Sequence, residues 1–175
     1  IIAPFNQQIA FAPQISIAAI NTDQSIVISG EQAVVAEVVS KFDSLGIRSK
    51  QLQVSHAFHS PLMAPILQEF KQVAESVTYY PPQAKLISNV TGKLATSEIA
   101  TAGYWVNHVM APVRFAAGMK TLQQSCNIFL EVGSKPILIG MGRSNMAVEG
   151  KNTVWLPSLR PRKKDWQQIM QTLRD

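Results

Sequence analysis

The residues with the clearest potential for chemistry are two histidines, His56 and His59, in the segment 54–63. A neutral imidazole takes a proton from a hydroxyl or thiol near neutral pH, which is the task of a general base. Ser60 and Pro61 follow directly, and these residue types favour the N-cap and the first position of a helix. We therefore expect His59 beside a helix N-terminus, where the positive end of the dipole favours a neutral ring. This placement favours His59 over His56 as a base.

The same histidines also allow less specific interpretations. The chain contains 3 histidines and 1 cysteine, and zinc usually has three or four protein ligands, so no metal site is predicted. Cys126 has no evident basic neighbour to favour its thiolate and is interpreted as a small buried apolar residue. On spacing alone, a structural role for either histidine is at least as well supported as a catalytic one. A base also needs a group to activate, and the sequence has no Gly-x-Ser-x-Gly nucleophile motif.

The elements that must position the histidines begin with a small α+β pattern. Residues 15–20 and 25–29 are rich in β-prone apolar side chains, and a turn separates the two predicted strands. A helical spacing of apolar residues follows Gly30 and ends at Gly46. Residues 47–54 are interpreted as a further strand that leads into the histidines. Two strands, a helix and a strand indicate a unit of the split βαβ kind.

After the histidines, short apolar strands continue to alternate with helices, which is typical of an α/β layer with a parallel sheet. Predicted helices span 60–77 and 101–109 and begin at Pro112, Pro136 and Asp165, and predicted extended segments are 85–90, 127–133 and 154–161. The strand within 127–133 is expected to be buried. The last helix is amphipathic and carries the apolar residues Trp166, Ile169, Met170 and Leu173.

The composition limits the class of protein. With 175 residues, of which 46% are hydrophobic and 15% charged, the chain is long enough to form one domain with a core. No apolar run approaches the roughly 20 residues that cross a bilayer, and no signal peptide is evident. A single cysteine fits a reducing compartment, so we expect a cytoplasmic protein. The first residue is Ile1 rather than Met, which suggests a piece of a longer polypeptide.

The formal charge of +5 would suit a nucleic-acid partner if it formed a basic stripe. Residues 160–175 hold five basic and two acidic residues, so +3 of that charge lies in the tail. The remainder is close to neutral and has no basic stripe with interleaved aromatic residues, so no nucleic-acid partner is predicted. The basic tail is interpreted as a solvated surface or, alternatively, as a docking site for a partner protein.

Several motifs resemble one family over nearly the whole chain. The segment His56-Ala57-Phe58-His59 is similar to the His-Ala-Phe-His segment of acyltransferase domains in modular type I polyketide synthases. The resemblance continues, in the order of the family, through residues 18–21, 27–30, 88–92, 104–108, 112–115 and 129–133. Residues 156–160 resemble the linker that follows such domains and packs against the neighbouring ketosynthase.

The resemblance implies an α/β fold with two subdomains and a linker. Residues 1–53 correspond to most of a ferredoxin-like small subdomain, and residues 54–150 to the C-terminal part of a hydrolase-like large subdomain with a parallel sheet and helices. Residues 151–175 correspond to the start of the linker. The serine nucleophile, the oxyanion-hole donors and the arginine that holds the malonyl carboxylate would all precede Ile1.

The implied reaction moves a malonyl unit from coenzyme A to the phosphopantetheine thiol of an acyl carrier protein, through an ester on the missing serine. His59 matches the catalytic histidine of the family. A backbone carbonyl in the segment around His108 would orient its ring, and Asn89 would lie near the same site. The resemblance implies no bound cofactor and two partners, namely the carrier protein and, through the linker, the ketosynthase of the same polypeptide.

The residues His56, Ala57 and Phe58 match the pattern associated with malonyl rather than methylmalonyl units. Phe58 would occupy the space that an α-methyl group needs, a discrimination of about 1–3 kcal/mol. Without the serine, this segment alone is expected to be inactive. The alternatives are a non-catalytic docking module of a multienzyme and a free-standing malonyl transferase of fatty-acid synthesis.

Overall fold

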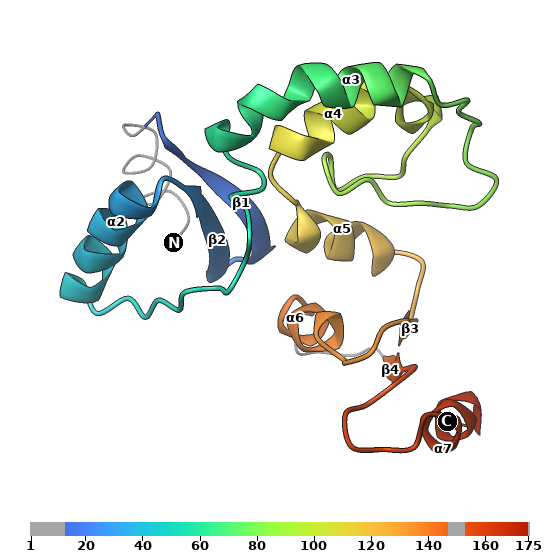
Figure 1. Cartoon of the computed structure of the whole chain (residues 1–175). Coiled ribbons are helices and arrows are strands. Elements are labelled where there is room, and N and C mark those ends of the chain that lie inside the picture. The colour runs from blue at the N-terminus through green and yellow to red at the C-terminus, as the bar shows by residue number, and fades with distance from the viewer. Residues whose placement is uncertain (1–12, 147–152, 175) are drawn as a thin grey trace.

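The chain alternates strands and helices, as Figure 1 shows for the computed structural model, which describes residues 13–146 and 153–174. Strand β1 (Ile15–Thr22) pairs antiparallel with strand β2 (Ser25–Gly30), and helix α2 (Gln32–Ser44) packs beside them. This group matches the two strands and the helix predicted from the sequence. Its buried core residues are Ile15, Val38 and Phe42.

The end of α2 is as predicted, but the strand expected after it is wrong. Gly46 has a φ of 73°, the left-handed conformation with which glycine commonly ends a helix. The following segment, 47–54, contains no strand. Leu52 and Val54 are exposed instead. An extended apolar segment becomes a strand by pairing with a neighbour, and none of the described residues pairs with this one.

The segment after the histidines begins with a tighter helix than predicted. In place of one α-helix over 60–77, a 3-10 helix η1 (Pro61–Ile66) precedes the α-helix α3 (Leu67–Glu75). Pro65 lies inside η1 and has no N–H to donate to an α-helical hydrogen bond. The helix-dipole argument for His59 therefore loses its basis, because the neighbouring element is a short 3-10 segment.

Helix α4 (Ala102–Met110) packs against α3, and the two lie side by side in Figure 1. The short 3-10 helix η2 (Ser97–Ala100) leads into it. The Thr101 hydroxyl caps α4 by accepting a hydrogen bond from the Tyr104 N–H at 3.2 Å. The predicted helix 101–109 is thus confirmed to within one residue at each end.

The strand predicted at residues 85–90 is also wrong, since Ile87 forms only an isolated antiparallel bridge with Leu94. The Ser88 hydroxyl accepts hydrogen bonds from the N–H groups of both Val90 and Thr91, each at 3.2 Å. Such side-chain bonds turn the backbone and compete with a strand ladder. Gly92 completes the turn with a φ of 70°.

The C-terminal half contains helix α5 (Phe115–Leu122), strand β3 (Ile128–Glu131), helix α6 (Leu138–Ser144) and strand β4 (Val154–Pro157). Strands β3 and β4 pair in parallel, and the rings of Phe129 and Trp155 stack with centroids 4.5 Å apart. The parallel pairing confirms the α/β class with helices around a parallel sheet.

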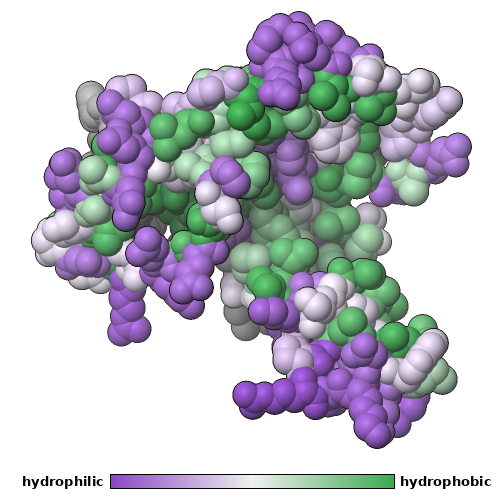
Figure 2. Space-filling view, in the orientation of Figure 1, coloured by the Kyte–Doolittle hydropathy of each residue, from purple (hydrophilic) through white to green (hydrophobic). Residues whose placement is uncertain are grey.

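Two predictions for this half need correction. Helix α5 begins at Phe115 rather than at Pro112, because Val113 pairs with β1. Strand β3 is not buried on both faces, because Ile128 and Leu130 are exposed on one face. Figure 2 likewise shows hydrophobic residues at the surface of the face in view, in the region of α3, α4 and α5.

The last element is the predicted amphipathic helix, α7 (Asp165–Arg174). Its polar residues Gln168 and Thr172 are buried against the end of β4. None of the helices in the described ranges is long and apolar enough to cross a membrane. The division of the chain at residues 53 and 150 stays a prediction.

Candidate active site

His59 lies between the β1–β2 group and helix α4, and its backbone is held from both sides. Its φ is 60°, in the left-handed region that few residues with a side chain adopt. Its N–H donates to the carbonyl of Val109, near the end of α4, at 3.1 Å. Its carbonyl accepts a hydrogen bond from the hydroxyl of Ser16, on β1. The position of His59 therefore depends on residues that are 43 and 50 positions away in the chain.

Ser60 fixes the direction in which the chain leaves His59. Its side chain is fully buried. Its hydroxyl donates to the carbonyl of Ala57 at 2.6 Å and accepts a hydrogen bond from the N–H of Leu62 at 3.3 Å. The second bond is the predicted N-cap, with Pro61 as the first residue of η1. The cap is confirmed, although it begins a 3-10 rather than an α-helix.

The ring of His59 faces a second imidazole. The rings of His59 and His108 meet edge to face with centroids 6.0 Å apart. Burial lowers the pKa of His108, and the nearby His59 lowers it further. The Nδ1 atom of His59 is buried and has no hydrogen-bond partner among the described residues. His59 thus has as a ring neighbour a second histidine whose lowered pKa favours its neutral form.

The connection from α4 to α5 extends the network on both sides of the site. Val113 donates its N–H to the carbonyl of Ala18 at 2.8 Å, and its carbonyl accepts the N–H of Ile20 at 2.9 Å. The next residue, Arg114, donates its N–H to the carbonyl of Asn89 at 2.8 Å. The structure thus brings Asn89 to the α4–α5 connection through its backbone, while its side chain is exposed.

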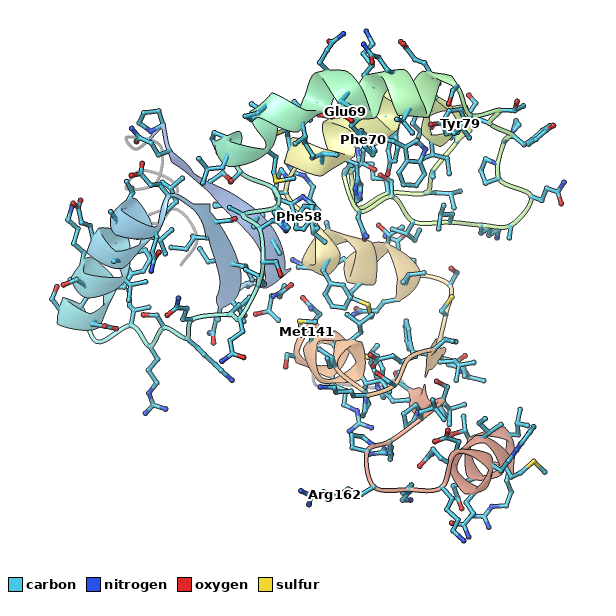
Figure 3. All side chains as sticks on the ribbon, viewed as in Figure 1. Phe58, Glu69, Phe70, Tyr79, Met141 and Arg162 are labelled. Carbon is cyan, nitrogen blue, oxygen red and sulfur yellow. The ribbon has the colours of Figure 1, made fainter. Side chains whose placement is uncertain are left out.

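The three residues before His59 lie at the surface of the same region. The rings of His56 and Phe58 are 5.8 Å apart, and Ala57 is half-buried. Phe58 is 54% exposed. Figure 3 shows it where the chain passes between β1 and the helices α4 and α5. No group of three or more histidine, cysteine, aspartate or glutamate side chains suited to a metal is found within residues 13–146 and 153–174.

Some residues that build the site carried no signal in the sequence. Ser16 is one of several polar residues in an ordinary strand pattern, and Val109 bonds His59 through its backbone carbonyl. Ser88, which is almost completely buried, bonds the hydroxyl of Tyr104 at 2.8 Å and caps its own turn. These bonds explain Ser88 as a structural serine rather than a nucleophile.

Comparison with known proteins places these features in a family. The acyl transferase domain family matches residues 3–175. The phenolphthiocerol synthesis polyketide synthase type I Pks15/1 of Mycobacterium bovis is 47% identical over 134 residues, which are 76% of this chain and 6% of that protein. The spectinabilin polyketide synthase system protein NorB of Streptomyces orinoci is 43% identical over 140 residues, which are 79% of this chain and 6% of that protein.

A solved structure gives the same result. The acyltransferase domain from the second module of the salinomycin polyketide synthase aligns with a TM-score of 0.89 and 35% identity, over 98% of this chain and 40% of that one. The family model and the shared fold therefore define the class as an acyl transferase α/β domain. The chain belongs to the acyl transferase domain family, as represented in polyketide synthases. It spans only 6% of the length of each of these two curated synthases.

Proposed function

We propose that this chain forms part of an acyltransferase that moves a malonyl unit from coenzyme A to the phosphopantetheine thiol of an acyl carrier protein in polyketide biosynthesis. The observation that carries this proposal is the half-buried imidazole of His59, on a backbone that two distant elements hold in a left-handed conformation. Non-glycine residues held in this way are concentrated at active sites. The reaction itself is inferred from the family whose His-Ala-Phe-His segment residues 56–59 resemble.

In the proposed mechanism His59 is the general base for two successive attacks. It takes the proton of a serine hydroxyl as the serine oxygen attacks the thioester carbonyl, and the proton then leaves with the coenzyme A thiol. In the second half, His59 takes the proton of the phosphopantetheine thiol as its sulfur attacks the serine ester. The proton then returns to the serine oxygen. The serine is expected outside these 175 residues.

The end of α4 has the chemistry needed to orient the ring of His59. Pro112 has no N–H for the carbonyl of His108, which lies four residues before it and would otherwise bond it within the helix. The preceding carbonyl, of Asn107, does accept such a bond, from Ala111 at 2.8 Å. We propose that the His108 carbonyl accepts the Nδ1–H of His59 in the complete domain. The unpartnered, buried Nδ1 atom supports this assignment.

The triplet His56, Ala57 and Phe58 is proposed to favour malonyl over methylmalonyl units. The exposed ring of Phe58 lies one residue before the base, so it can restrict the space next to the α-carbon of the acyl group. A pocket distinguishes one methyl group by about 1–3 kcal/mol, which predicts a preference rather than exclusion. Asn89 is proposed to support the same site from the α4–α5 connection.

The linker is proposed to dock on the ketosynthase of the same polypeptide, with the carrier protein as the second partner. Helix α7 supports a docking role because its apolar side is outward, with Trp166, Met170 and Leu173 exposed by 76%, 60% and 75%. The inward side of this helix is polar, and its Thr172 hydroxyl donates to the carbonyl of Pro157 at 2.6 Å. Figure 3 shows Arg162, in the segment before α7, far from Phe58. The linker surface is thus separate from the proposed site.

The test uses the complete acyltransferase domain that contains these residues. We expect malonyl-coenzyme A to leave a malonyl ester on one serine, detected by intact-protein mass spectrometry, and a carrier protein to remove it. His59→Ala should reduce both steps by at least a hundredfold, the low end for general acid–base catalysis. Residues 1–175 alone should form no ester. Absence of an ester in the complete domain would favour the docking-module alternative and refute the proposed function.

A further inference from the structure

Strand β1 is hydrogen-bonded to both segments that hold the proposed base. The hydroxyl of Ser16 donates to the carbonyl of His59. Two residues further along, the carbonyl of Ala18 accepts the N–H of Val113 at 2.8 Å. Val113 follows α4, whose Val109 carbonyl accepts the N–H of His59 at 3.1 Å. These five residues thus form a closed path from β1 through the histidine and α4 back to β1.

In this path, the Ser16 hydroxyl is the group that belongs to a side chain. The other contacts join backbone to backbone and do not depend on which side chains are present. His59 has a left-handed backbone, which the surrounding bonds must maintain because an L-residue prefers other conformations. Without the hydroxyl, the carbonyl of His59 loses this donor and the backbone can relax, which would turn the imidazole away from the reacting groups.

We propose that Ser16 is a positioning residue for the transfer reaction, acting through the backbone of His59. This inference depends on the proposed function and extends it, because it gives the β1–β2–α2 group a direct part in the chemistry. Because the same imidazole serves both attacks, loss of the Ser16 hydroxyl should slow both half-reactions by a similar factor. A defect in binding one substrate would slow only one of them.

The chain contains a matched control on the same sheet. Ser29 on β2 lies directly opposite Ser16 in the antiparallel register. Its hydroxyl makes no hydrogen bond within the part of the chain that the structure describes, and the residue is half-buried, as Ser16 is. Ser16→Ala and Ser29→Ala therefore make the same chemical change on neighbouring strands, but only the first removes a bond to His59.

The experiment measures single-turnover formation and removal of the serine ester in the complete acyltransferase domain. Ser16→Ala should slow both steps by about threefold to tenfold, the range that one neutral hydrogen bond corresponds to, with KM for malonyl-coenzyme A unchanged. Ser16→Thr keeps the hydroxyl and should retain the wild-type rates. Ser29→Ala should also react at wild-type rates, and circular dichroism should show the same fold for all variants.

The outcomes separate the inference from the proposed function. If the wild-type domain forms no serine ester, the proposed function fails. If it forms the ester but Ser16→Ala and Ser29→Ala react equally fast, the positioning role is refuted while the function stands. A slow Ser16→Thr would also refute it, because that variant keeps the donor. If Ser16→Ala does not fold, Ser16→Thr and Ser16→Val make the same comparison, since they differ by a hydroxyl in place of a methyl group.

Discussion

Substitution of Gly92 by alanine tests whether the turn that carries Asn89 is set by packing against α5. Gly92 has a φ of 70°, and its N–H donates to the carbonyl of Ser88 at 2.7 Å. Its own carbonyl accepts the hydroxyl of Thr121 at 2.6 Å. A Cβ atom at position 92 would lie 2.4 Å from the Cβ of Ala117 and 3.1 Å from backbone atoms of α5. The turn therefore has no room for a side chain.

The magnitude follows from two separate costs. An alanine in the left-handed region costs about 1–2 kcal/mol. Overpacking against the backbone of α5 adds about 1–3 kcal/mol. Gly46 separates the two costs, because its φ is 73° but, apart from its chain neighbours, none of the described residues has an atom within 4 Å of its Cβ position. Gly46→Ala should therefore lower the free energy of unfolding by about 1–2 kcal/mol, and Gly92→Ala by about 2–5 kcal/mol.

The assay is denaturant unfolding of the complete domain, followed by tryptophan fluorescence and circular dichroism. Gly140→Ala serves as a third variant, because this position in α6 is open and has no left-handed φ. It should be neutral or stabilising by up to about 1 kcal/mol. Equal losses in Gly92→Ala and Gly46→Ala would refute the packing argument, because the contact with Ala117 would then contribute nothing.

Three further predictions concern the site, the sheet and the acyl unit. Burial and His59 lower the pKa of His108, so the unfolded chain binds more protons at this residue than the folded chain does, and stability falls with falling pH. His108→Gln should therefore flatten the fall in unfolding free energy below about pH 6.5. An unchanged pH profile of urea unfolding would contradict this. Glu131→Gln should lower the free energy of unfolding by about 1–3 kcal/mol in the same assay, because the carboxylate of Glu131 accepts hydrogen bonds from three backbone N–H groups at the start of α6. Glu131→Asp, which keeps the charge on a shorter side chain, is the comparison. An unchanged free energy of unfolding in Glu131→Gln would count against this role of the carboxylate. Phe58→Ser should raise the methylmalonyl share in competition with malonyl-coenzyme A by about 10-fold or more, measured by mass spectrometry of the loaded carrier protein, and an unchanged ratio would refute steric selection.

The fold class and the ends of several elements could be predicted from local sequence. Thr101 before α4, Ser60 before Pro61 and Gly46 after α2 are residue types whose side-chain or backbone chemistry starts or stops a helix. The structure confirms the predicted cap at Ser60 and the predicted helix end at Gly46, and it shows in addition that Thr101 caps α4. Apolar spacing located β1, β2 and β3 because isoleucine, valine or phenylalanine recurs in each of these short strands.

The two incorrect strand predictions have a common physical cause. Residues 47–54 and 85–90 are apolar enough for strands, yet an apolar segment becomes a strand only where another segment pairs with it. In the second case the Ser88 hydroxyl supplies local hydrogen bonds that turn the chain instead. The incorrect helix prediction has a separate, local cause. Pro65 removes an α-helical hydrogen bond, and residues Pro61–Ile66 form a 3-10 helix before α3 in place of one continuous α-helix.

The candidate site shows the same division between local and distant determinants. The type and neighbours of His59 indicated a base, but the reason given for its state, a helix N-terminus, is not what the structure contains. A six-residue 3-10 helix follows His59, and the backbone of this proposed base is held instead by Ser16 and Val109. Two segments far away in sequence must therefore be folded before the histidine has its backbone conformation. If His59 is the base of the proposed reaction, substitutions in β1 or at the end of α4 should alter the transfer rate without touching the acyl group.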